Sequence, residues 1–156
     1  MFERIAYVSR ALASTDTRAV SDIVRVSNNR NAERGLTGAL IFLDGYYLQV
    51  IEGLPGPLHD RFAIIAADSR HTQVSVRLTA KITTLVFPES WMAIRQGDAI
   101  LEATKCAFGY KVGFPADQFS GDKLVAFALA CCKAHSNTRT IKILTPRLIF
   151  GQEIAL

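Results

Sequence analysis

The chain has 156 residues, of which 49% are hydrophobic and 21% charged, and its formal net charge is +4. These values are ordinary for a soluble globular protein, and the length suits one domain with an appendage. The longest apolar runs, such as residues 39–43, are too short to cross a bilayer, and no secretion signal opens the chain. We therefore expect a cytoplasmic protein that makes no membrane contact.

Basic residues and cysteines give no sign of a nucleic-acid or metal site. The eighteen lysines and arginines are scattered without a dense run, so nucleic-acid binding is not expected despite a pI near 9.1. Cys106, Cys131 and Cys132 include no C-x-x-C spacing. We expect them to be reduced thiols rather than a disulfide or a set of metal ligands.

The first half of the chain predicts a strand, a helix and a hairpin. Residues 4–9 alternate as a strand, with Tyr7 on one face and Ala6 and Val8 on the other. Capping residues at 14–17 then precede four positions at the spacing of one helical face, namely Val20, Ile23, Val24 and Ser27. Two apolar strands, about 36–43 and 46–52, are joined at Asp44-Gly45, a dipeptide suited to a tight turn.

Gln49 lies in the middle of the second hairpin strand and shares a face with Tyr47 and Ile51. A buried amide without a partner costs about 1–3 kcal/mol, so a polar group should face it. Tyr7 and the polar segment 27–31 are the candidates. Tyrosine, asparagine and glutamine together offer donors and acceptors without charge, which suits the edge of a neutral, planar, amide-containing ring.

A second helix begins at Pro55-Gly56-Pro57, because proline is tolerated in a first helical turn. Its predicted buried stripe is Leu58, Phe62 and Ile65. Arg70 and His71 would close it, at an end where the helix dipole favours cations. Strands over about 74–82 and 91–95 complete the order β-α-β-β-α-β-β. This order predicts an α+β, ferredoxin-like sheet with both helices on one face.

Past residue 98 the pattern changes. A helix is predicted near 122–134, with an apolar stripe formed by Leu124, Phe127, Ala128 and Cys131. We expect it to pack on the sheet face opposite the two core helices. Residues 140–146 are predicted to be extended.

Five short motifs carry a resemblance to a known family. In chain order they are Tyr7-Val8-Ser9, Asn31 four residues before Gly35-Leu36-Thr37-Gly38, Gln49-Val50-Ile51-Glu52-Gly53, Asp68-Ser69-Arg70-His71, and Phe87-Pro88 followed by Trp91-Met92. Over residues 2 to about 98 the chain resembles the BLUF family of flavin-binding blue-light sensors. The resemblance implies a sensor domain over 1–98 and a helical extension over 99–156.

The resemblance also implies the residue roles. Flavin would bind noncovalently between the two helices, with Asn31 on its C4=O and N3–H. Excited flavin would draw an electron and a proton from Tyr7, after which Gln49 rotates or tautomerises and the absorption shifts to the red. The other expected cofactor contacts are Ile23, Ser27, Arg30, Ile64, Asp68, Arg70 and His71.

Signal output is expected to pass through Trp91 and Met92. Many relatives carry Phe-x-x-Trp-Ser-Met, whereas residues 87–92 here read Phe-Pro-Glu-Ser-Trp-Met. Met92 keeps the family position and Trp91 is shifted by one. On a strand that shift turns Trp91 to the opposite face, unless the strand carries a bulge.

We therefore predict a photoreceptor rather than an enzyme. Its expected cofactor is FAD, with FMN or riboflavin left open, and its output would need a change of homo-oligomeric state or a separate protein partner. A small hydrolase of the acylphosphatase type and an RNA-binding module are the alternatives. Against them, no glycine-rich phosphate loop precedes a helix, and the strands lack a basic-aromatic signature.

Overall fold

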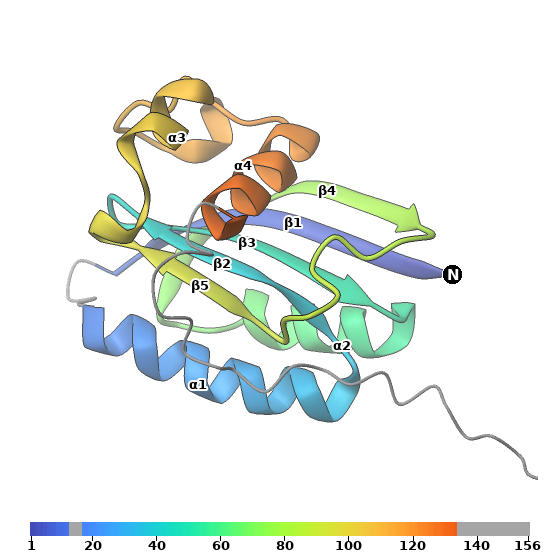
Figure 1. Ribbon diagram of the computed structural model, residues 1–156. Coiled ribbons are helices and arrows are strands. Elements are labelled where there is room, and N and C mark those ends of the chain that lie inside the picture. Colours follow the sequence, from blue (N-terminus) through green and yellow to red (C-terminus); the bar gives the residue numbers. More distant parts are fainter. Residues whose placement is uncertain (13–16, 134–156) are drawn as a thin grey trace, which may run out of the picture.

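The computed structural model describes residues 1–12 and 17–133, which form a sheet with helices on both faces (Figure 1). The main elements in chain order are β1 (Phe2–Ala11), α1 (Thr17–Arg34), β2 (Thr37–Leu43), β3 (Tyr46–Gly53), α2 (Pro55–Ala66), β4 (His71–Ile82), β5 (Ala93–Gln96), α3 (Glu102–Ala107) and α4 (Gly121–Lys133). Among the described residues, no helix has the length and apolar character that a membrane span requires.

The sheet has five strands in the order β4-β1-β3-β2-β5. Neighbours among the first four strands are antiparallel, and β5 joins the edge parallel to β2. The β2–β3 turn places Asp44 and Gly45 at φ 51° and 81°. Two successive positive φ angles are those of a type I′ hairpin turn, which confirms the prediction from the dipeptide.

The two faces of the sheet bury separate cores, as alternation along the strands predicts. Helices α1 and α2 cover one face and α4 covers the other (Figure 1). The α1/α2 core includes Ile5, Tyr7, Val20, Val24, Leu40, Tyr47, Ile51, Leu58 and Met92. The α4 core includes Ala6, Val8, Ile41, Leu48, Val50, Leu124, Phe127, Ala128 and Cys131. The ferredoxin-like arrangement and the position of the carboxy-terminal helix are therefore as expected.

Several expected boundaries are wrong: β1 extends beyond the predicted 4–9, and β4 begins before the predicted residue 74. The second helix ends at Ala66, so Arg70 lies in the following turn and His71 opens β4. The cause is local: the Asp68 carboxylate accepts a hydrogen bond from the Arg70 backbone N–H (2.9 Å), which favours a turn over another helical residue. The last strand also begins later than predicted, at Ala93. The expected caps at 14–16 and the extended segment 140–146 lie outside the described residues.

A buried ion pair holds the β4–β5 connection against the sheet. Glu52 is fully buried and accepts from Arg4 Nε at 2.6 Å. Its other carboxylate oxygen accepts the backbone N–H groups of Val86 and Phe87, at 2.8 and 3.0 Å. The connection then reaches the α1/α2 core at Met92.

Candidate functional site

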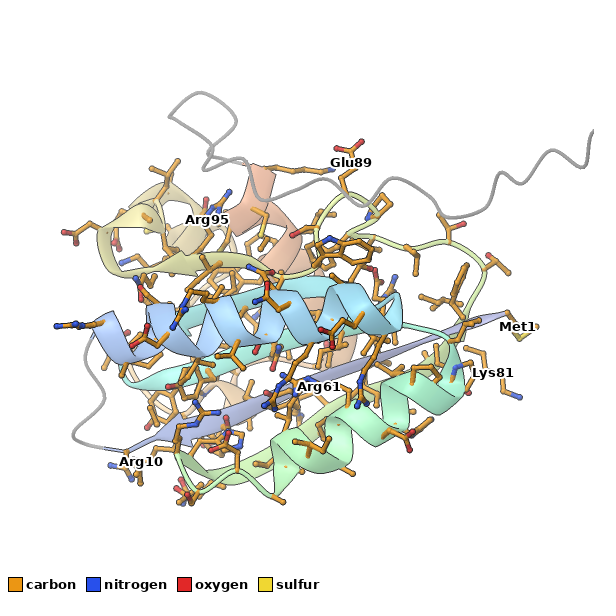
Figure 2. All side chains as sticks on the ribbon, turned by 90° about the horizontal axis from the view of Figure 1, so that it is seen from below. Met1, Arg10, Arg61, Lys81, Glu89 and Arg95 are labelled. Atoms are coloured by element: carbon orange, nitrogen blue, oxygen red, sulfur yellow. The ribbon has the colours of Figure 1, made fainter. Side chains whose placement is uncertain are left out.

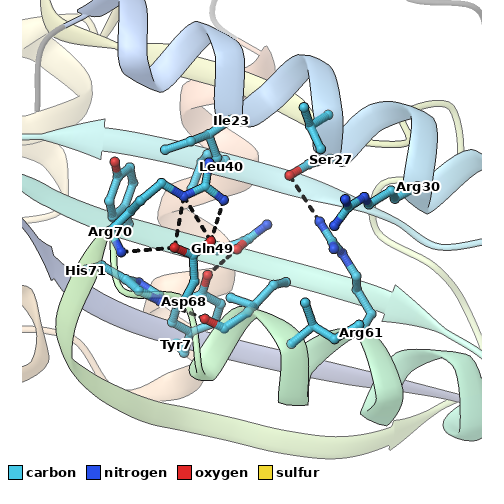
Figure 3. Close-up of a pocket in the computed structure, with 14 residues that line it drawn as sticks. Tyr7, Ile23, Ser27, Arg30, Leu40, Gln49, Arg61, Asp68, Arg70 and His71 are labelled. Carbon is cyan, nitrogen blue, oxygen red and sulfur yellow. Dashed lines mark hydrogen bonds and ion pairs between the residues drawn. The ribbon is translucent and has the colours of Figure 1, made fainter.

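A pocket lies between α1 and α2 on the α1/α2 face of the sheet (Figure 3). The space between its lining residues is about 600 Å³, a value that includes volume open to solvent. Its lining residues are Tyr7, Ile23, Val26, Ser27, Arg30, Leu40, Tyr47, Gln49, Arg61, Ile64, Ile65, Asp68, Arg70 and His71. Of the residues expected to contact a cofactor, only Asn31 is not part of this lining.

Two residues that line the pocket, Tyr7 and Gln49, form a continuous series of side-chain contacts with Met92, which lies behind them. Tyr7 and Gln49 face each other in the β1–β3 register, and the Tyr7 hydroxyl donates to Gln49 Oε1. Gln49 Nε2 in turn donates to the sulfur of Met92 at 3.3 Å. A thioether is a weak acceptor, so the donor end of the Gln49 amide is held loosely.

Burial determines the protonation state of Tyr7. Tyr7 is 2% exposed and Gln49 is 5% exposed. Removal from water raises the pKa of Tyr7 well above its ordinary value, because the phenolate would be poorly solvated there. Tyr7 is therefore a neutral hydroxyl at physiological pH and can donate to Gln49.

Asn31 lies next to the pocket, in the last turns of α1. It is completely buried, and its Nδ2 donates to the backbone carbonyl of Trp91 at 2.9 Å. Its Oδ1 has no hydrogen-bond partner in the part of the chain that the structure describes. A buried acceptor left unpaired is costly, which makes it a natural position for a ligand N–H.

The turn after α2 supplies a charged pair and a fixed imidazole. Arg70 Nε bonds both oxygens of Asp68, at 2.8 and 2.9 Å. Hydrogen bonds from Arg70 lower the pKa of Asp68 to about 2, so this carboxylate stays ionised. One ring nitrogen of His71 bonds Ser9 Oγ and the other bonds the Ile65 carbonyl, both at 2.7 Å, which fixes the ring edge-on to Tyr7.

Both helices supply aliphatic and polar groups to the pocket. From α1, Ile23 offers an apolar surface, whereas Ser27 and Arg30 offer polar groups (Figure 3). From α2, Ile64 lines the pocket at 48% exposure, and the more buried Ile65 lies beside it. A planar ring between the helices would thus have aliphatic side chains available on both faces.

The predicted output residues have different roles in the geometry. Met92 is fully buried and contacts Gln49 directly. Trp91 precedes β5, is partly buried, and meets the site through its backbone carbonyl, which accepts from Asn31. Because Trp91 lies outside the strand, the alternation rule that assigned it to the opposite face does not apply to it.

Sequence reasoning missed one charged residue of the site. Arg61 is 5% exposed, lines the pocket and donates to Ser27 Oγ from Nη2 at 3.3 Å. A signal was available, since Arg61 stands three residues after Leu58 on the apolar stripe of α2. A cation on a buried stripe is uncommon unless it has a partner.

Comparison with known proteins shows the family of this chain. The family model described as "BLUF: Sensors of blue-light using FAD" matches residues 2–93, more than half of the chain. The chain belongs to the BLUF family. Its BLUF domain is a flavin-binding sensor of blue light, and the match gives no support to the hydrolase or RNA-binding alternatives.

Relatives with other architectures share this BLUF domain. Photoactivated adenylate cyclase subunit beta of Euglena gracilis is 30% identical over 87 residues, which is 56% of this chain and 10% of that protein. The chain therefore spans about a tenth of the length of the curated relatives that it matches.

Solved structures show the same fold. The dark-state structure of the BLUF protein BlrB has a TM-score of 0.71 and 26% identity, over 85% of this chain and 96% of that one. Klebsiella pneumoniae BlrP1, solved with FMN and cyclic diGMP, has a TM-score of 0.58 and 25% identity, over 62% of this chain and 26% of that one.

The residues present suit the flavin that the BLUF family binds. The unpaired Oδ1 of Asn31 is an acceptor available to a ring N–H, and the neutral Tyr7–Gln49 pair suits a ring edge rich in acceptors. Aliphatic groups from α1 and α2 are available for the ring faces.

Proposed function

We propose that this BLUF protein senses light through the Tyr7–Gln49–Met92 chain, with flavin held in the pocket between α1 and α2. The proposal rests on two hydrogen bonds. The buried, neutral Tyr7 donates to Gln49 Oε1, and Gln49 Nε2 at the other end of the amide donates to the sulfur of Met92. An amide has chemically opposite ends. Turning or tautomerising Gln49 therefore exchanges a donor for an acceptor wherever it faces the ligand.

Tyr7, Gln49 and Met92 each have one role in the proposed mechanism. Bound flavin supplies blue absorption and, once excited, the capacity to take an electron and a proton. Tyr7 is the donor of both, since its hydroxyl is protonated and already oriented by Gln49. Gln49 stores the change as a new hydrogen-bond pattern, and Met92 senses it because its sulfur is the present partner of Gln49 Nε2.

Asn31 holds the ring edge in this proposal, through its unpaired Oδ1 and its Nδ2. The secondary contacts come from Ile23, Ser27, Arg30, Ile64, Asp68, Arg70 and His71, all of which line the pocket. FAD is the proposed flavin, in line with the family description.

Output is proposed to travel from Met92 along β5 to α4. Next in sequence, β5 carries Arg95, whose Nη2 donates to the Cys132 carbonyl of α4 at 3.0 Å. A shift of Met92 therefore acts on a strand that is hydrogen-bonded to the last turn of α4. Residues 1–98 would be the sensor and 99–156 the output extension, acting in the cytoplasm through self-association or a separate protein rather than by catalysis.

The test begins with the purified protein. It should be yellow and should release flavin on heating, and its size by gel filtration should differ between darkness and blue light. A colourless protein would contradict flavin binding. A yellow protein whose size and associations ignore light would contradict the proposed output alone.

A further inference from the structure

Arg61 is a buried cation whose polar groups are not fully used. Figure 2 shows it between α1 and α2, and Figure 3 shows its contact with Ser27. That 3.3 Å contact to a neutral hydroxyl is its one side-chain hydrogen bond among the described residues. Its Nε is buried and has no hydrogen-bond partner within residues 1–12 and 17–133. A guanidinium that is 5% exposed and not paired with a carboxylate indicates that a further partner enters the pocket.

The other charged side chains of the pocket lining do not neutralise the positive charge of Arg61. The pocket lining contains three arginines and one aspartate, 3 − 1, a net charge of +2. The aspartate, Asp68, already pairs with Arg70. Burial, followed by the nearby cations Arg30 and Arg34, lowers the pKa of Arg61. The side of the pocket near Ser27 is therefore positive without a compensating carboxylate.

We propose that Arg61, together with Arg30, binds the phosphate on the ribityl chain of the flavin, so that the pocket selects FMN and FAD over riboflavin. This inference rests on the proposed function, because it requires flavin in this pocket. It adds a selectivity for the phosphate-bearing forms and a residue that the family motifs do not contain.

The chemistry favours a phosphate over the ring as the partner of Arg61. The ring edge is neutral, and Asn31 and Gln49 already match it without charge. A net charge of +2 has no counterpart in a neutral ring. A guanidinium fork matches the geometry of phosphate oxygens and gains more from an anion than from a carbonyl. An exposed Arg30 beside a buried Arg61 can complete such a site from the solvent side.

The decisive experiment compares riboflavin, FMN and FAD on the same apoprotein, by quenching of flavin fluorescence. The wild-type protein should bind FMN and FAD about tenfold more tightly than riboflavin, and added salt should weaken only those two. Arg61→Gln should abolish the difference by lowering the affinity for FMN and FAD while leaving riboflavin affinity nearly unchanged. Arg61→Lys, which keeps the charge, should restore part of it.

Arg25→Gln is the matched control, because Arg25 is exposed on α1, pairs with Asp22 and does not line the pocket. It should leave all three affinities unchanged. Equal affinities in the wild-type protein would overturn the phosphate assignment. So would an equal loss for all three flavins in Arg61→Gln, which would place Arg61 on the ring or in a structural role. No binding of any flavin by the wild-type protein would contradict the proposed function itself.

Discussion

At the scale of single residues, the proposed light switch depends on hydrogen-bond capacity rather than on charge. Tyr7 and Gln49 are neutral, buried and opposite each other on neighbouring strands. The charged residues of the pocket stand apart from them, in the turn after α2 and along the side near Ser27. Changes to the neutral pair should therefore alter the light response, and changes elsewhere should alter binding.

Gln49→Leu and Tyr7→Phe should each retain flavin and lose the light-induced red shift. Ring binding is spread over many contacts, whereas the switch needs both polar groups. Asn31→Ala should do the opposite and weaken flavin retention, since it removes a buried donor and acceptor. Absorption spectra of the three purified variants, before and after illumination, decide the matter. A normal shift in Gln49→Leu would refute the mechanism.

The red shift should be insensitive to pH from neutrality to about pH 10. Burial raises the pKa of Tyr7 in the folded protein above the 10.0 of a free tyrosine. The stabilisation from a protonated Tyr7 is thus complete below pH 10 and is lost as the pH rises beyond it, because the unfolded chain ionises first. The difference in melting temperature between wild type and Tyr7→Phe should be constant below pH 10 and should change only above it. A red shift that titrates away nearer neutrality would contradict this environment for Tyr7.

At the scale of elements, α4 is set very close to the sheet. The first residue of α4, Gly121, has no room for a side chain: an added Cβ would lie 2.4 Å from the Arg77 carbonyl oxygen and 2.6 Å from Leu78 Cβ. Because one of these neighbours is backbone, α4 must move to accept any substitution. The start of the output helix is therefore fixed against β4, and its last turn is fixed to β5 by Arg95.

Gly121→Ala should lower the free energy of unfolding by about 1–3 kcal/mol, as overpacking does, and should leave flavin binding intact. Gly56→Ala is the matched control in α2, where an added Cβ meets nothing within 4 Å. It should be neutral or stabilise by up to about 1 kcal/mol. Urea unfolding of both variants provides the measurement. Equal stability of Gly121→Ala and wild type would mean that α4 does not sit at this distance.

Sequence periodicity predicted most of these elements, and local chemistry explains the rest. Alternation assigned Tyr7 and Ala6 to opposite faces, because a sheet with two buried faces requires it. It could not show that Asp68 would bond the Arg70 backbone and end α2 early. Helical spacing places Arg61 on the apolar stripe of α2, but it could not show that Ser27 from another helix would be its partner. The family resemblance named nine of the fourteen residues that line the pocket, but Arg61, outside the family motifs, could be identified as part of the lining only from the fold.

At the scale of the whole molecule, the sheet separates the pocket from the face that α4 covers. The pocket opens between α1 and α2, whereas α4 packs its apolar stripe on the other face (Figure 1). Strand β5 belongs to both sides, since Ile94 joins the α1/α2 core and Ala93 packs toward α4. Because the pocket and α4 lie on opposite faces of the sheet, we expect the photochemistry not to require α4.

Truncation after Gly97 should preserve the photochemistry and expose the α4 face of the sheet. That face would then present Ala6, Val8, Ile41, Leu48 and Val50 to solvent. An apolar surface of this kind promotes association, so aggregation or a changed size is expected. Gel filtration in darkness and in light tests this. A truncated protein that stays monodisperse, with unchanged light-dependent size, would show that α4 neither protects the sheet nor carries the signal.

The central claim is that light rearranges hydrogen bonds around Gln49 without forming a covalent bond. A light-minus-dark absorption spectrum of the purified wild-type protein tests it most directly. The flavin bands should move to the red without losing intensity and should return in the dark without any added reductant. Bleaching of the bands under blue light, as a cysteine adduct or net reduction would produce, would contradict the account.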